Sequence, residues 1–197
     1  MKYSICLIFF FFLITLACAD TTWTPFQFQV GDNFRYEIIR QTDDKEKKLG
    51  FFDFQVTQKE ESRLKFKWQI EEGDLTKSNS FYSTINQLSG KILVDMMVNG
   101  SELSELIAQS LFAPTLELQY RNLSIEEGES RSRRGGSSKL TVGKAIKIAG
   151  IDGLTVSYYE KDELIFEHVI DKSTPLPLSI KTKDKEGRIV VWRLTEQ

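Results

Sequence analysis

Few residues of this chain have the types and spacing that catalysis or metal binding requires. The chain has one histidine, His168, and two cysteines, Cys6 and Cys18. A metal site built on several His or Cys ligands is therefore excluded. The sequence also lacks the glycine-rich loops that bind phosphate groups and the Gly-x-Ser-x-Gly motif of a nucleophilic serine. We expect no metal, no cofactor and no enzymatic activity.

His168 is the residue that could still carry chemistry. Strand alternation places it on the same face as Leu164, Phe166 and Ile170, which directs it toward the core or toward a cavity wall. Three roles are open: a neutral imidazole hydrogen-bonded in the interior, a polar group inside an apolar ligand pocket, and a catalytic base. The sequence supplies no serine partner for a base, which favours the interior role.

Charged residues indicate no strongly electrostatic partner. The formal net charge is −2, and both signs are interspersed along the chain, so we expect no nucleic-acid partner. A Gly- and Ser-rich stretch over 126–138 predicts a loop with a basic cluster of Arg131, Arg133 and Arg134. This loop is either solvated or in contact with anionic lipid headgroups at a membrane surface.

The first 19 residues have the layout of a secretory signal peptide. Lys2 gives a positive start, Ile5–Leu16 is almost wholly apolar, and Ala17-Cys18-Ala19 places small residues at the cleavage position. Cleavage after Ala19 would leave one domain, residues 20–197. An uncleaved N-terminal anchor is an alternative.

Cys18 gives a further alternative, because Leu16-Ala17-Cys18 resembles a bacterial lipoprotein site at which the cysteine is lipidated. If Cys18 is removed instead, the mature domain has no cysteine and hence no disulfide. That composition favours a bacterial envelope over eukaryotic secretion. We expect an exported protein, secreted or periplasmic, and membrane-anchored if Cys18 carries lipid.

Large apolar side chains alternate with polar ones along several segments, which indicates half-buried strands. The clearest example is 64–70, where Phe66 and Trp68 alternate with polar residues, and the same pattern includes Tyr36 and Phe54. Short polar connections favour an antiparallel meander. The aromatic face is either a packed core or the lining of a cavity for an apolar ligand, so Tyr36, Phe54, Phe66 and Trp68 are candidate ligand-binding residues.

One helix is predicted near Ser101–Phe112. Asn99 and Glu102 resemble a helix start, and Leu103, Leu106 and Ile107 fall on one helical face. Such a helix could lie across the open side of the sheet, so these three residues and His168 complete the cavity candidates. The apolar run Ile92–Val98 is ambiguous between strand and helix.

The last third of the chain is again rich in strand signals, and Pro175 and Pro177 predict an edge or bend there. The predicted fold is therefore mainly β. We expect a curved antiparallel meander sheet, half-barrel or barrel-like, with one short amphipathic helix as lid.

Three segments carry a family resemblance: Val30–Glu37, His168–Leu178 and Gly187–Leu194. In this order they resemble exported bacterial proteins of unknown function related to the lipoprotein carriers and receptors of the LolA/LolB-like superfamily. The resemblance implies a strongly curved antiparallel sheet, a helical lid and an apolar cavity for acyl chains. It brings no catalytic residues.

Two functional hypotheses follow. The first is an exported, non-catalytic binding or carrier module of the cell envelope that holds lipid or another apolar ligand. The second is a structural or interaction protein with a solid β core, which binds an unspecified protein partner through a loop or through an edge strand marked by Pro175 and Pro177.

Overall fold

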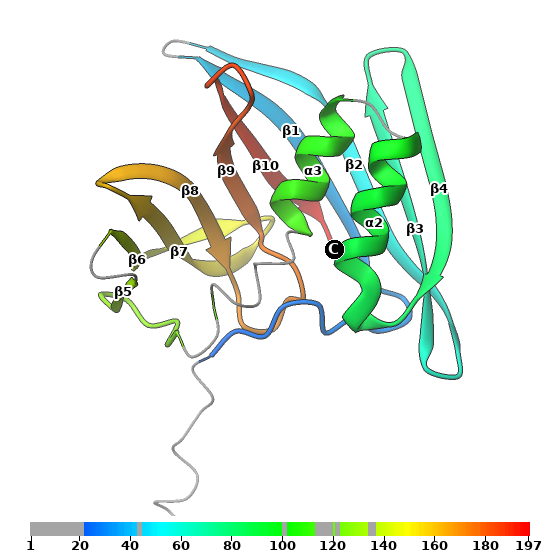
Figure 1. Cartoon of the computed structure of the whole chain (residues 1–197), viewed down its shortest axis with the longest axis horizontal. Coiled ribbons are helices and arrows are strands. Elements are labelled where there is room, and N and C mark those ends of the chain that lie inside the picture. Colours follow the sequence, from blue (N-terminus) through cyan, green and yellow to red (C-terminus); the bar gives the residue numbers. More distant parts are fainter. Residues whose placement is uncertain (1–21, 43–44, 100–101, 113–119, 121–122, 134–136) are drawn as a thin grey trace, which may run out of the picture.

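The computed structural model describes residues 22–42, 45–99, 102–112, 120, 123–133 and 137–197. Ten strands form one antiparallel sheet in the order β4-β3-β2-β1-β10-β9-β8-β7-β6-β5. The strands are β1 (Asn33–Thr42), β2 (Lys45–Glu60), β3 (Arg63–Glu72), β4 (Leu75–Ser83), β5 (Ser130–Arg133), β6 (Ser138–Ile148), β7 (Ile151–Glu160), β8 (Glu163–Ile170), β9 (Ser179–Lys183) and β10 (Ile189–Glu196). The sheet is open, and β6–β8 run at a steep angle to β1–β4 (Figure 1). The predicted curved sheet with a helical lid is confirmed.

Alternating burial along β1, β2 and β3 follows the sequence pattern. In the register of these strands Phe34 lies opposite Phe54, and Phe54 lies opposite Trp68. Directly opposed residues of an antiparallel pair point to the same face, so the aromatic side chains of three strands gather on one side of the sheet. All three of these side chains are at most 1% exposed.

Two helices, α2 (Ile85–Asn99) and α3 (Glu102–Leu111), cover this face of the sheet (Figure 1). The predicted helix is α3, and the ambiguous run Ile92–Val98 is part of α2, so the expectation of a single helix was wrong. On α2 the apolar pattern is blurred, because Val94 and Met97 are exposed while Ile92 is buried. The sequence therefore shows no clean polar face for this helix.

Two further expectations are corrected. The predicted loop over 126–138 contains β5, which pairs with β6 along one edge of the sheet. Gly and Ser around this strand leave no apolar alternation to reveal it. Of the edge or bend expected at Pro175 and Pro177, the bend is confirmed at Pro175 and Leu176. The edge was wrong, since β9 lies between β8 and β10 and Leu176 is 1% exposed. The edges of the sheet are β4 and β5.

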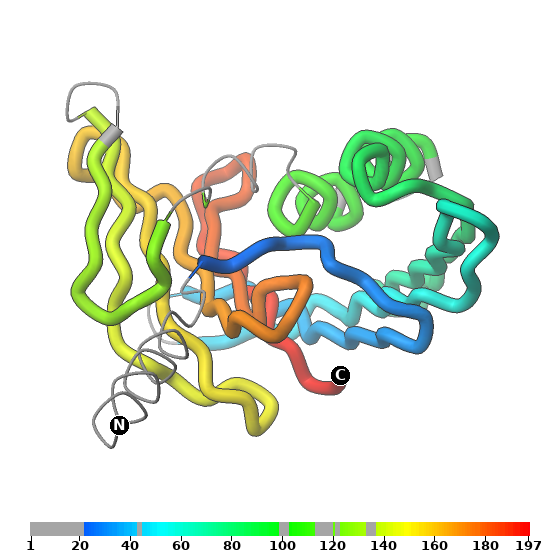
Figure 2. The backbone as a smooth tube through the Cα atoms, turned by 90° about the horizontal axis from the view of Figure 1, so that it is seen from below, coloured from blue at the N-terminus to red at the C-terminus, as the bar shows by residue number. Residues whose placement is uncertain are grey.

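The proline segment is buried because the N-terminal segment packs on it. Figure 2 shows residues 22–32 crossing one end of the molecule beside the 171–178 segment. The Trp23 indole donates a hydrogen bond to the Thr174 carbonyl at 2.7 Å, and the Phe26 amide donates to the Pro175 carbonyl at 2.8 Å. These bonds satisfy carbonyls that the sheet does not use.

The expected signal peptide, residues 1–19, lies outside the described residues, and so do Cys6 and Cys18. The side chains of Arg133 and Arg134 are likewise not described. Within the described part of the chain, no helix has the length and apolar character to span a membrane.

Candidate functional site

Four of the predicted ligand-binding residues, the aromatic ones, lie in the packed core beneath the helices. Tyr36, Phe54, Phe66 and Trp68 are each 0% exposed. The Phe54 ring lies 5.5 Å from the Phe66 ring and 4.9 Å from the ring of Phe112, the residue after α3. Side chains therefore fill the space against these strands. A ligand contact by these four residues stays a prediction.

Polar groups of this core have partners in other elements. The Tyr36 hydroxyl donates to the Pro177 carbonyl at 2.8 Å, and the Trp68 indole donates to Asp95 on α2 at 2.6 Å. Ile107 on α3 is also 0% exposed. Together with the four aromatic residues, Ile107 and Leu103 belong to one core cluster of packed side chains.

His168 lies apart from the aromatic four and is 2% exposed. Its Nδ1 is 2.5 Å from the Tyr120 hydroxyl, and its ring stacks on Phe166 at 4.5 Å. Burial lowers the pKa of His168 to about 3 and raises the pKa of Tyr120 above its ordinary value. Both groups are therefore neutral across physiological pH, which matches the interior role among the three left open.

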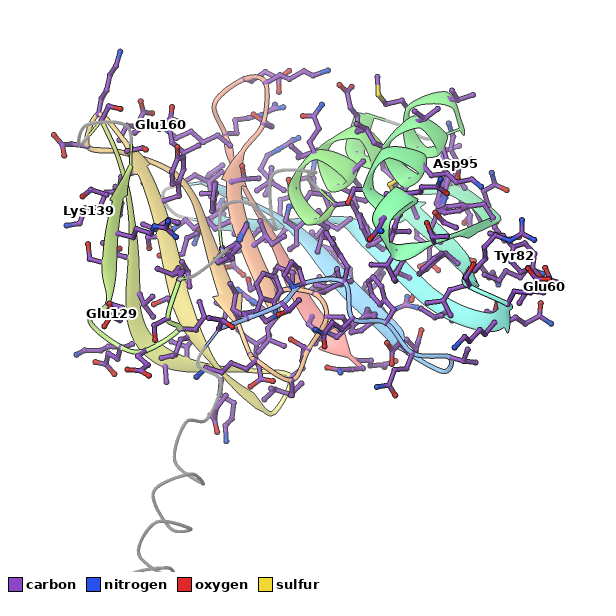
Figure 3. The ribbon with its side chains drawn as sticks, turned by 60° about the horizontal axis from the view of Figure 1, so that its bottom comes forward. Glu60, Tyr82, Asp95, Glu129, Lys139 and Glu160 are labelled. Atoms are coloured by element: carbon purple, nitrogen blue, oxygen red, sulfur yellow. The ribbon has the colours of Figure 1, made fainter. Side chains whose placement is uncertain are left out.

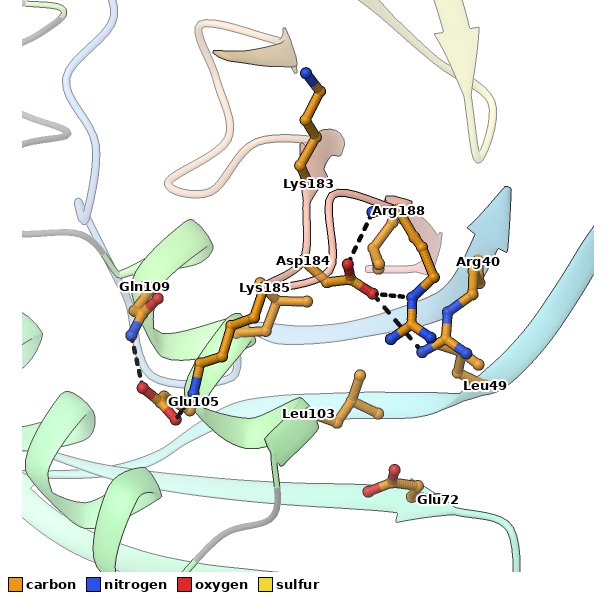
Figure 4. Close-up of a pocket in the computed structure, with 12 residues that line it drawn as sticks. Arg40, Leu49, Glu72, Leu103, Glu105, Gln109, Lys183, Asp184, Lys185 and Arg188 are labelled. Atoms are coloured by element: carbon orange, nitrogen blue, oxygen red, sulfur yellow. Dashed lines mark hydrogen bonds and ion pairs between the residues drawn. The ribbon is translucent and has the colours of Figure 1, made fainter. Parts of the chain in front are cut away.

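Two of the candidates, Leu103 and Leu106, line a pocket of about 330 Å³ along one side of α3. We call it the α3 pocket (Figure 4). Its apolar walls also include Leu49 of β2 and Val190 of β10. Residues from a helix and from two strands thus surround a volume within the range of small-molecule sites.

A β-bulge directs Leu49 to this pocket. Ile38 pairs with Gly50 and Ile39 pairs with Lys48, so Leu49 is the extra residue of β2. Gly50 permits the distortion, because a Cβ atom there would lie 1.8 Å from the Glu71 carbonyl oxygen of β3. Bulges of this kind redirect a side chain locally.

The β9–β10 turn supplies the charged wall of the pocket. Asp184 accepts hydrogen bonds from the Arg188 Nε at 2.7 Å and from the Arg188 amide at 2.8 Å. Burial alone would raise the pKa of Asp184, but these hydrogen bonds lower it below its ordinary value. Asp184 therefore stays ionised and fixes the turn against the pocket.

An ion pair joins the same turn to α3. The Lys185 Nζ lies 3.0 Å from Glu105, which also accepts a hydrogen bond from Gln109 at 3.0 Å (Figure 4). Lys185 and Glu105 are 80 residues apart in sequence. The pair spans the rim of the α3 pocket and holds the helix beside the turn.

Arg40 is one of the four basic residues of the pocket, with Lys183, Lys185 and Arg188, that sequence reasoning missed. It follows Ile38 on the inner face of β1 and lies opposite Val190 in register. Its Nη2 is 3.8 Å from Asp184, beyond hydrogen-bond distance. Its Nε is buried, and no described residue accepts a hydrogen bond from it. The sequence did carry a signal for Arg40: the apolar alternation of β1 ends at Ile38, and the next residue on the same face is charged.

Within the described residues, no group of three or more His, Cys, Asp or Glu side chains could hold a metal ion.

No protein-family model matches the chain, and no curated protein matches it. Among solved structures, MucB is similar with a TM-score of 0.41 and 13% identity, over 93% of this chain and 56% of the MucB chain. The chain thus spans little more than half of MucB. A Bacteroides fragilis protein with a YmcC-like fold, thought to be exported, has a TM-score of 0.40 and 8% identity, over 89% of this chain and 98% of that one. Both TM-scores are below 0.5, and neither likeness places the chain in a family.

Proposed function

We propose that the protein is an exported, non-catalytic binding or carrier module of the cell envelope that holds one lipid or other apolar ligand in the α3 pocket. The observation that carries the proposal is the pocket itself, about 330 Å³, in which four of the twelve lining residues, Leu49, Leu103, Leu106 and Val190, form an apolar wall and the other eight are polar or charged. Export follows from the signal-like residues 1–19.

The size of the pocket limits the ligand. Small-molecule pockets have volumes of roughly 300–1,000 Å³, and the α3 pocket is near the lower bound. A single short acyl chain or one small apolar group fits this volume better than a lipid with several chains. Because the aromatic residues beneath the helices pack on one another, we assign binding to the pocket and stability to the aromatic core.

Titration of the purified protein with octanol, followed by calorimetry, tests this proposal. We expect binding to the native protein and its loss in Leu106→Trp, because the larger ring fills the pocket. Leu75→Trp is the matched control, since Leu75 is 61% exposed on another part of the surface. Absence of octanol binding, or equal binding by Leu106→Trp, would contradict the proposal.

The alternative of an interaction protein is favoured by a different observation, the edge strand β4. Its nine residues contain one charged side chain, Lys77, whereas exposed edges are usually protected by several charges or by proline. A partner strand could pair along this edge. Sedimentation should then show the native protein in a complex with a partner, and Ser80→Lys should abolish that complex. A native protein that forms no complex with any partner tested argues against this alternative.

A further inference from the structure

We propose that the α3 pocket selects an amphiphile with a single anionic head group, whose oxygens bind the Arg40 guanidinium while its short apolar tail lies against α3. The inference rests on the proposed function and adds the chemical class of the ligand. Carboxylate and phosphate heads share this chemistry, since both offer two oxygens to a guanidinium.

The argument begins with the unmet hydrogen-bonding capacity of Arg40. Three buried side-chain atoms of the described residues have no hydrogen-bond partner: Asn33 Oδ1, Arg40 Nε and Trp192 Nε1. Of these residues, Arg40 is the one that lines the α3 pocket. The Nε has almost no exposed surface, whereas the Arg40 side chain as a whole is 28% exposed. An anion that enters the pocket would therefore bind the Nη atoms of the guanidinium.

Neighbouring carboxylates do not meet this need. Asp184 is engaged by the Nε and amide of Arg188, and its distance of 3.8 Å from Arg40 gives attraction without a hydrogen bond. Glu105 is engaged by Lys185 and Gln109. Asp184 and Glu105 are thus oriented toward other donors, and Arg40 keeps hydrogen-bonding capacity for a ligand.

The apolar wall begins next to this cation. Val190 is the register partner of Arg40, and Leu49 lies near Arg40 in the pocket wall (Figure 4). A head group on Arg40 therefore places the first tail carbons on Val190 and Leu49, and the rest against Leu103 of α3. The other three basic residues of the pocket, Lys183, Lys185 and Arg188, are paired with Glu163, Glu105 and Asp184. The adjacency of the Arg40 cation and a short apolar wall is complementary to an amphiphile.

Glu72 limits the ligand to one anionic group. Its carboxylate lines the same pocket but lies away from Arg40, beyond Leu103 in the close-up (Figure 4). A second negative group at the far end of a ligand would be repelled there. A monoanionic amphiphile is therefore favoured over a dicarboxylate of the same length.

Calorimetry with four ligands that share one tail tests the inference: octanoate, octyl phosphate, octanol and octylamine. We expect at least one of the two anions to bind the native protein about tenfold more tightly than octanol, because a charge-assisted hydrogen bond contributes on that order. Octylamine should bind most weakly. The tighter of the two anions identifies the head group as carboxylate or phosphate.

Arg40→Gln should remove the preference for anions and leave octanol binding in place. Arg63→Gln is the control, because Arg63 is an exposed residue of β3 paired with Glu60. If Arg40→Gln does not fold, Arg40→Lys replaces it and should retain a weaker anion preference. The inference is overturned, and the proposed function stands, if the preference for anions survives Arg40→Gln. The same holds if octanol binds as tightly as both anions. Failure of octanol to bind the native protein overturns the proposed function as well.

Discussion

At the scale of single residues, the buried pair of His168 and Tyr120 shows how burial sets protonation. The two side chains meet at 2.5 Å inside the sheet, and burial lowers the pKa of His168 to about 3. A histidine in the unfolded chain has its ordinary pKa of 6.5. Between these two pKa values, His168 is protonated in the unfolded chain and neutral in the folded state.

This difference predicts a pH-dependent stability. Between the two pKa values the unfolded state binds more protons, so the free energy of unfolding rises with pH. The contribution of His168 should be complete above about pH 6.5 and decrease by up to about 1.4 kcal/mol per pH unit as the pH falls toward 3. Urea unfolding between about pH 7 and pH 5 measures it, above the range in which most carboxylates titrate.

The control is His168→Gln, which keeps a polar side chain near Tyr120 and removes the titrating group. The variant should be less stable at neutral pH, and its stability should change less between about pH 7 and pH 5. Equal slopes for the variant and the native protein would show that the buried imidazole does not govern the acid sensitivity.

Sequence reasoning placed His168 correctly on the inner face of its strand, because period-two alternation fixes the face of every residue in a strand. It did not identify Arg40, although the same alternation through Phe34, Tyr36 and Ile38 leads to this position. Alternation shows which way a side chain points. It does not show which distant segments surround that side chain.

At the scale of elements, Asp95 connects α2 to two strands of the sheet. One carboxylate oxygen accepts the Trp68 indole N–H of β3 at 2.6 Å, and the other accepts the Asn79 amide of β4 at 2.7 Å. Figure 3 shows Asp95 on the side of α2 that faces β4. The helix is thus fixed by polar contacts in addition to the burial of Leu88, Ile92 and Met96.

Replacing Asp95 should therefore loosen α2 from the sheet. Asp95→Ala removes the acceptor of the fully buried Trp68 indole and of the Asn79 amide. Because two donors lose their acceptor, we expect the free energy of unfolding to decrease by about 2–4 kcal/mol. Asp95→Asn retains one acceptor oxygen and should cost less. Urea unfolding measures both, with Asp152→Ala at an exposed ion pair as control. A loss no larger than that of the control would contradict this role.

Element prediction succeeded where local pattern and environment agree. The alternation of β1, β2 and β3 and the amphipathic face of α3 could be predicted, because one side of each is buried. Two elements could not. The helix α2 keeps Val94, Met97 and Val98 exposed, and β5 is a polar strand held by its pairing with β6. Tertiary contacts determine both.

At the scale of the whole molecule, the apolar residues form one continuous core, within which two sets differ in their surroundings. One set is the aromatic core around Phe54, where ring contacts fill the space under the helices. The other lines the α3 pocket, which joins segments from residue 40 to residue 190. A sequence pattern gives no information on such distant contacts, so Leu103 and Leu106 could be predicted as apolar candidates but their pocket partners could not.

This division can be tested with one pair of variants. Phe54→Leu should lower the free energy of unfolding by about 1–3 kcal/mol, because it leaves a void among stacked rings, and should leave octanol affinity unchanged. Leu106→Ala should weaken octanol binding with a smaller loss of stability, since Leu106 is only partly buried. Urea unfolding and calorimetry on both variants give the comparison. A folded Phe54→Leu protein that no longer binds octanol would instead place the ligand among the aromatic residues, and the core would then be the binding site.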